Sequence, residues 1–305
     1  MHMSDENSAP GQRRGQISLP DGIRHVLAPN PSPMTHQGTN SYILGRGDVA
    51  VVDPGPMEAS HLAALQSCLA PGERIAAVLV THSHVDHSAS ARALAVAHNA
   101  PVYGFGGVTA GRSALMEQLA EEGHLGGGEG VDHGFTPDIT LADGDCLDLG
   151  GMSVSAHHTP GHFGNHLSFE IGDTVLTGDI VMGWTSTVIS PPDGDLGSYF
   201  RALDRLQACK ATLFLPGHGD PVREPAKRID DLRAHRLARH AQILNVLTAG
   251  PASAQGIAMQ VYGDLPPRVM AAATRNCLAH LIDMMEKDQV SVDGVITDRA
   301  IFGLR

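Results

Sequence analysis

Short apolar runs separated by turn residues dominate the first two thirds of the chain. Runs of this length between turn residues are typical of β-strands. The run at residues 75–80 is apolar without interruption, which predicts a strand covered on both faces. Strands are predicted at residues 23–27, 41–44, 49–52, 75–80, 146–149, 153–157, 166–171, 174–177 and 212–215.

Apolar residues at helical spacing lie between these strands and prevail after residue 221. Ser88 is a candidate cap for the second helix. Asp293-Gly294 predicts the turn of a hairpin at residues 290–296. Three helices followed by a small hairpin is the order of a winged helix. Helices are predicted at residues 57–69, 88–98, 199–207, 225–247, 253–262 and 267–287.

The change in pattern predicts two domains after an N-terminal tail. Residues 1–18 are polar and lack the apolar stretch of a secretory signal, so we expect a flexible tail. The first domain is expected over residues 19–222 and the second over residues 223–305. Within the first, the glycine-rich residues 123–134 predict a mobile loop and a candidate lid.

The distribution of charge along the chain supports the same division into two domains. The chain carries a net charge of −12, which does not favour nucleic-acid binding by the molecule as a whole. Residues 222–305 carry 11 basic and 9 acidic residues, a net charge of +2, so the preceding part carries a net charge of −14. No apolar run is long enough to cross a bilayer. The four cysteines lie far apart without a CxxC motif, which favours a reducing compartment, and we expect the cytoplasm.

The strongest chemical signal is a histidine-rich motif directly after the buried strand at residues 75–80. His82 and His84 are two residues apart in extended backbone, so both side chains point the same way and can bind one ion from one side. Asp86 and His87 follow where the chain turns into a helix, so they can face a second ion beside it. Imidazole and carboxylate ligands suit Zn²⁺, and also Mn²⁺ or Fe²⁺.

Three further ligand-type residues follow other predicted strands. They are His162 in TPGH, Asp179 in TGD and His218 in PGHG. Each alone is weak, because a single histidine is more often structural and a Gly-Asp pair more often a turn. Together they indicate one site, since strand ends converge at one edge of a sheet. The two oxygens of Asp179 can bridge two ions.

This set resembles the metallo-β-lactamase superfamily. The resemblance implies an α+β fold, a four-layer αββα sandwich with two metal ions, followed here by a small, mostly helical winged-helix-like domain. It implies that His82, His84 and His162 hold one metal, that Asp86, His87 and His218 hold the other, and that Asp179 bridges. The segments TPGHFGNH and PGHGDP, with Asn276–Leu281, are similar to the β-lactamase-like protein 2 group within the superfamily.

The resemblance implies hydrolysis by a hydroxide that bridges the two metals. Asp86 is expected to orient the nucleophile and to pass a proton to the leaving group. His166 is a candidate catalytic residue that either supports the ligands or contacts substrate, and a purely structural role weighs about equally. Trp184 is expected either to line the pocket or to pack in the core.

Three functions remain open from the sequence. The first is hydrolysis of a small thioester, ester or lactone, which the acidity of the first domain favours. The second is endonucleolytic cleavage of single-stranded RNA, with phosphate contacts from the arginines of the long helix, whose alternative role is a solvated face. The third is a metal-sensing, DNA-binding regulator, which requires a metal site closed to water. Those arginines are Arg228, Arg233, Arg236 and Arg239.

Overall fold

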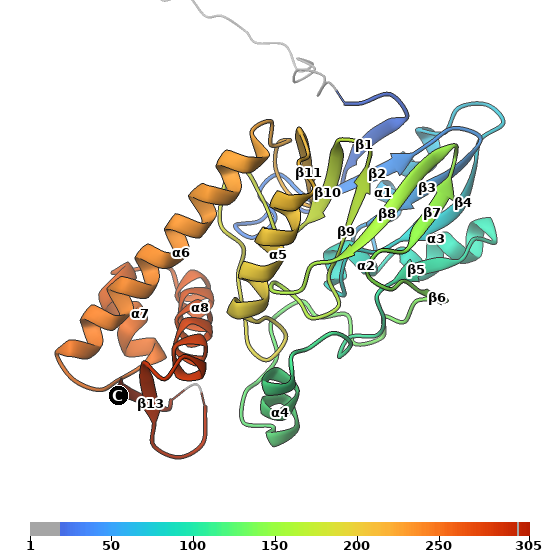
Figure 1. Ribbon diagram of the computed structural model, residues 1–305. Helices are drawn as coiled ribbons and strands as arrows, with labels where there is room; N and C mark the ends of the chain where they lie inside the picture. Colours follow the sequence, from blue (N-terminus) through green and yellow to red (C-terminus); the bar gives the residue numbers. More distant parts are fainter. Residues whose placement is uncertain (1–18, 298) are drawn as a thin grey trace, which may run out of the picture.

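Two mixed β-sheets face each other at the centre of the larger part of the protein (Figure 1). The computed structural model describes residues 19–297 and 299–305, so the tail predicted at residues 1–18 lies outside the described residues. One sheet contains, in order, β1 (Ile23–Leu27), β2 (Asn40–Leu44), β3 (Asp48–Val52), β4 (Arg74–Leu79), β5 (Val102–Gly104) and β6 (Ile139–Thr140). The other contains β11 (Leu213–Pro216), β10 (Thr174–Gly178), β9 (Leu167–Ile171), β8 (Met152–His158) and β7 (Cys146–Leu149).

Alternating side chains place β3 and β4 between two apolar layers. Ala50 and Leu79 point into the core between the two sheets, where Phe169 meets them from the second sheet. Val51 and Val78 point the other way, against the outer helices. The prediction that residues 75–80 form a strand covered on both faces is therefore confirmed.

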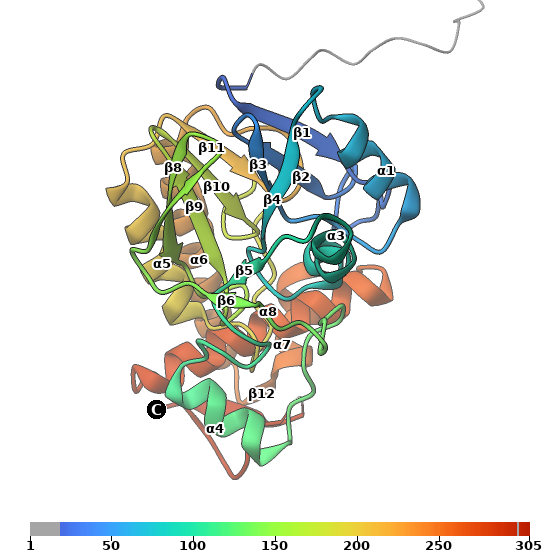
Figure 2. The ribbon, with the colours of Figure 1, turned by 90° about the vertical axis from the view of Figure 1, so that its right-hand side faces the viewer.

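Helices cover the outer face of each sheet and complete the four layers (Figure 2). On the first sheet these helices are α1 (Ala59–Ser67) and α3 (Ala91–His98). On the second sheet they are α5 (Leu196–Ala208) and the first half of α6 (Pro225–Thr248). The αββα sandwich is thus confirmed.

The C-terminal part has a core of its own. That core joins the second half of α6 to α7 (Ala254–Tyr262), α8 (Pro267–Glu286) and a three-stranded sheet. The strand order in this sheet is β12 (Ala252–Ser253), β14 (Ile301–Leu304) and β13 (Val290–Val292). Helices followed by a small antiparallel pair confirm the winged-helix expectation.

The division into domains at residue 222 stays a prediction, and α6 belongs to both packing units. Ile229 and Leu232 pack on the sandwich, whereas Ile243 and Leu247 pack in the C-terminal core. The short helix α4 (Ala114–Glu122) also packs on the C-terminal core, although it comes from the middle of the sandwich sequence. The two units therefore share an extensive apolar contact.

Several local predictions need correction. Ser88 does not cap a helix; it ends the short helix α2 (Val85–Ser88), and its hydroxyl donates to His84 O and Asp132. Asp293-Gly294 is not a two-residue turn, because Val292 pairs with Phe302 and leaves a longer loop between them. The short strands β5 and β6 were not predicted, since two or three residues of strand give no clear periodicity, and the nine-residue helix α4 was also missed.

The glycine-rich segment is fastened to the protein at several points. Gly130 O accepts from Val85 N, and Gly128 N donates to Asp193. Arg275 donates to the carbonyls of Gly126 and Gly127. These contacts attach the segment to the rest of the protein in this structure, and its role as a mobile lid stays a prediction. In the described part of the chain, no helix is both long and apolar enough to span a bilayer.

Candidate metal centre

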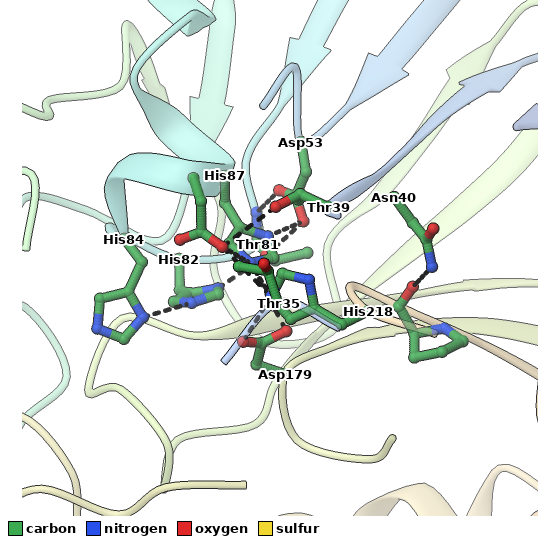
Figure 3. Close-up of polar contacts among 12 residues, drawn as sticks. Thr35, Thr39, Asn40, Asp53, Thr81, His82, His84, His87, Asp179 and His218 are labelled. Atoms are coloured by element: carbon green, nitrogen blue, oxygen red, sulfur yellow. Dashed lines mark hydrogen bonds and ion pairs between the residues drawn. The ribbon is translucent and has the colours of Figure 1, made fainter. Parts of the chain in front are cut away.

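Seven histidine and aspartate side chains meet at one edge of the two sheets. Figure 3 labels His82, His84, His87, Asp179 and His218 among them. The buried strand β4 ends at Leu79, so the next residues cross from the sheet to α2 and bring four ligand-type side chains with them. The remaining three follow β8, β10 and β11, and β10 and β11 run parallel with their ends together. The seven residues are His82, His84, Asp86, His87, His162, Asp179 and His218.

The ligand atoms fall into overlapping groups that fit two neighbouring ions. Within each group the candidate ligand atoms lie within 4.8 Å of one another. His84 Nδ1 is 2.9 Å from His82 Nε2 and 2.9 Å from His162 Nε2. The groups are His82, His84 and His162; His82, His87 and Asp179; and Asp86, His87 and His218.

Asp179 lies between the two histidine groups. One of its oxygens, Oδ2, is 3.8 Å from His162 Nε2 and 3.3 Å from His218 Nε2. The other, Oδ1, is 3.6 Å from His87 Nε2 and is buried without a hydrogen-bond partner. An unpaired buried carboxylate oxygen is costly, and a cation at this place would satisfy it. This geometry supports the bridging role.

Outer hydrogen bonds fix which nitrogen of each ring faces the centre. His162 Nδ1 and His218 Nδ1 lie 2.7 Å and 3.1 Å from the carbonyls of Val188 and Gly38, so both nitrogens must donate. In the neutral imidazole, Nε2 therefore presents a lone pair to the centre, where either a proton or a metal ion can bind it. Such outer partners orient metal-binding imidazoles and raise their basicity.

Asp53 provides the same support from beneath the histidine motif. Its Oδ2 lies 2.8 Å from His87 Nδ1 and 2.8 Å from Thr81 Oγ1, and Oδ1 accepts from Thr81 N at 2.7 Å. Since the Thr81 hydroxyl donates to Asp53, it accepts in turn from His82 Nδ1 at 3.0 Å. Asp53 is not among the ligand-type residues predicted from the sequence. Its place directly after a strand was the signal that could have identified it.

Burial and the carboxylates of the centre shift the pKa values of its histidines in opposite directions. Burial lowers the pKa of His84 to about 3, with the neighbouring His162 adding to the effect. Burial also opposes charge on His218, but Asp179 and Asp86 outweigh it and raise the pKa of His218 to about 10. Three carboxylates likewise raise the pKa of His87 well above its usual value against the effect of burial. The carboxylates that stabilise the protonated forms of His218 and His87 can equally stabilise a divalent cation at the centre.

The cluster is buried but reaches solvent at one side. His82 and His87 are fully buried, whereas the Asp86 side chain is 23% exposed. On the other face, a Cβ added to Gly217 would lie 2.5 Å from Asp179 Oδ1, so the PGHG turn approaches too closely for any other residue. A metal site with one open side suits catalysis, while structural sites are closed by protein ligands.

His166 lies behind the ligands and does not face substrate. It is fully buried, its Nε2 accepts from Asp179 N at 3.2 Å, and its Nδ1 lies 3.0 Å from Thr159 Oγ1. With both nitrogens engaged, His166 offers no free ring nitrogen to a substrate in this geometry, and its catalytic role stays a prediction. The arrangement agrees instead with a residue that positions Asp179.

An aromatic pair borders a groove beside the centre. Trp184 is 38% exposed, and its ring stacks on His36 with centroids 4.7 Å apart. Both residues line a groove of about 450 Å³ that also includes Pro221 and Val222, close in sequence to His218. Trp184 therefore lines a pocket and is not a core residue.

Two facing sheets covered by helices, with this ligand set at their common edge, define a metal-binding hydrolase class. Residues 34–218 match the family model of the metallo-beta-lactamase superfamily, and residues 253–298 match that of the beta-lactamase associated winged helix domain. The chain belongs to the metallo-β-lactamase superfamily and is a hydrolase with a C-terminal winged-helix domain.

Relatives cover most of the chain. It is 29% identical over 271 residues to the "Beta-lactamase-like protein 2 homolog" of Caenorhabditis elegans, covering 85% of this chain and 82% of the relative. It is 27% identical over 265 residues to the "Atrochrysone carboxyl ACP thioesterase" of Aspergillus chevalieri, covering 82% and 76%. A beta-lactamase domain protein from Burkholderia ambifaria has the same fold, with a TM-score of 0.78 at 23% identity over 94% of this chain and 93% of that one.

Proposed function

We propose that the protein hydrolyses a small thioester, ester or lactone at a centre of two divalent metal ions, with zinc as the first candidate and manganese or iron as alternatives. The observation that carries this proposal is the open, buried cluster of convergent imidazoles and carboxylates. His82, His84 and His162 are assigned to one ion, Asp86, His87 and His218 to the other, and Asp179 to both. When bound, two such ions polarise the scissile carbonyl and activate water as the nucleophile.

The chain's own residues prepare this chemistry. Asp53 and the carbonyls of Val188 and Gly38 hold the imidazoles in the tautomer that leaves a lone pair toward the centre. Asp86 is the more exposed of the two carboxylates in the ligand set, and Thr39 Oγ1 donates to its Oδ2 at 3.1 Å. We assign it the orientation of the attacking water and the transfer of a proton to the leaving group.

Substrate class follows from the surroundings of the centre. The groove close to His218 offers the Trp184 and His36 rings to an apolar or aromatic part of a substrate, and charged side chains such as Lys227 and Asp231 to a polar part. The acidity of the sandwich opposes the approach of a polyanion. The thioesterase name of one relative supports a thioester as the first substrate to test. All four cysteines are free, which agrees with our expectation of the cytoplasm.

The long-helix arginines give the RNA alternative little support. Arg228 and Arg236 donate to backbone carbonyls of the protein. Arg233 pairs with Asp204, and Arg239 lies over the Tyr262 ring. The exposed side of Asp86 also weighs against a metal sensor closed to water.

The test is one preparation assayed on acyl thioesters, lactones, aryl esters and single-stranded RNA, with the chelated protein as control. We expect metal-dependent turnover of an acyl substrate. Cleavage of RNA alone, declining as salt rises, would overturn the assignment in favour of a nuclease.

A further inference from the structure

The segment at residues 182–189 crosses beside the metal centre without regular secondary structure. It connects Asp179, at the end of β10, to the region before α5. Its own contact with the centre is at His162, whose Nδ1 lies 2.7 Å from Val188 O and 2.9 Å from Thr187 Oγ1. The placement of this imidazole therefore depends on the placement of a segment that no strand or helix fixes.

The C-terminal helices fix that segment through its backbone. From α6, Arg228 donates to Met182 O at 2.7 Å and to Thr185 O at 2.6 Å. Eight residues further along α6, Arg236 donates to Thr187 O. From α8, the Asn276 side-chain oxygen accepts from Ile189 N at 3.1 Å. Three carbonyls and one N–H group of the segment are thus held by two helices.

Arg236 is the centre of this arrangement. It is 2% exposed, and no carboxylate of the described residues forms an ion pair with it. Its guanidinium bridges Thr187 O and Asn276 Oδ1, the latter at 3.0 Å, and lies 5.3 Å from the centre of the Tyr199 ring. Burying a cation with only neutral acceptors is unfavourable. A buried apolar residue would fill this space at lower cost but could not hold the segment.

We propose that Arg236 and Asn276 are positioning residues for the metal ligand His162, and that the C-terminal domain completes the catalytic centre through them. A planar guanidinium can hold two acceptors in fixed directions, which a lysine ammonium does less well. Thr187 O and Ile189 N flank Val188, so fixing both sets the carbonyl that orients His162. The inference rests on the proposed function, because it assumes that His162 binds metal.

The experiment measures zinc affinity of the full chain by competition with a chromophoric chelator. Asn276→Ala and Arg236→Lys are expected to lose about 10–100-fold in affinity for one of two ions, as is usual when an outer partner of a ligand is removed. In the same two variants, the affinity for the other ion, held by Asp86, His87 and His218, is expected to stay at the wild-type level.

Two controls separate positioning from simple stability. Arg233→Met removes an arginine from the same helix that pairs with Asp204 at the surface. Ile257→Ala destabilises the C-terminal core from α7, where the side chain is fully buried. Both controls are expected to bind zinc as the wild type does, even where the melting temperature falls.

Wild-type affinity in Asn276→Ala and Arg236→Lys would overturn the inference while leaving the proposed function intact. An equal loss of affinity in Ile257→Ala would also overturn it, because general loosening would then explain the effect. A wild-type chain that binds no metal would overturn the proposed function itself. If the Arg236→Lys variant does not fold, the zinc affinity of the Asn276→Ala variant alone tests the inference.

Discussion

Two clusters in this protein contain similar residues but differ in what lies on their outer side. The candidate metal centre combines histidines and aspartates. On the second sheet, His157, Glu170 and Cys209 also lie within metal-binding distance of one another. In the metal centre the outer nitrogens donate to carbonyls or a carboxylate, which leaves lone pairs turned inward.

In the second cluster the outer partner is a cation. Arg205 donates to His157 Nδ1 from two nitrogens, at 3.2 Å and 3.0 Å. His157 Nε2 therefore carries the proton and donates to Glu170 at 2.5 Å. Burial also raises the pKa of the Cys209 thiol to about 11, so thiolate is scarce near neutral pH. Short distances between ligand-type residues are thus not enough to predict a metal site. The hydrogen bonds on the outer side of these residues decide whether their inner atoms can bind a cation.

The largest expected effect is at the exposed carboxylate of the metal centre. Asp86→Asn keeps the size of the side chain but removes a charge and a proton acceptor. We expect kcat to fall by about 10²–10⁴-fold with a folded protein, as for loss of a general acid–base group. Steady-state kinetics and circular dichroism check this, and normal turnover by the variant would remove Asp86 from the mechanism.

A smaller effect is expected at Asp53, which hydrogen-bonds the metal ligand His87 from its outer side. Asp53→Asn weakens the acceptor of His87 Nδ1 and alters the hydrogen bonds of Thr81. We expect metal affinity to fall about 10–100-fold, the usual range for outer partners. Chelator competition measures this, with the exposed Asp48→Asn as a matched control from the other end of β3. Equal affinities in the two variants would contradict the role given to Asp53.

The smallest effect is expected in the second cluster. Glu170→Gln removes a carboxylate that is 24% exposed on its side chain. The free energy of unfolding should fall by about 1 kcal/mol or less, because solvent weakens such pairs. Metal content and turnover should not change. A lower metal content in this variant would show that the second cluster binds an ion and would remove the contrast between the two sites.

The sequence allowed prediction of the ligands better than of their supports. His82 to His87 and the strand-end positions of His162, Asp179 and His218 follow local patterns, so their convergence could be predicted. Asp53 acts through contacts with residues 28 and 34 positions away, and Arg236 through a carbonyl 49 positions away. Such contacts depend on how segments far apart in the sequence pack together, which no local pattern contains. For the same reason the long-helix arginines looked like a phosphate-binding face.

The fold shows the same limit. Strands with alternating or continuous apolar residues were predicted within a residue or two at each end, as for β1 and β7. The wing was predicted with a tight turn because Asp293-Gly294 is a strong local signal, but pairing of Val292 with Phe302 sets a longer loop. Tertiary pairing overrides turn propensity here.

Metal analysis of the purified full chain tests the central claim most directly. Mass spectrometric metal content, measured beside turnover before and after chelation, should give close to two divalent ions per chain and activity that is lost and restored with them. Asp179→Ala, which removes the bridging carboxylate, should retain fewer ions. A metal-free protein with full activity would contradict the account.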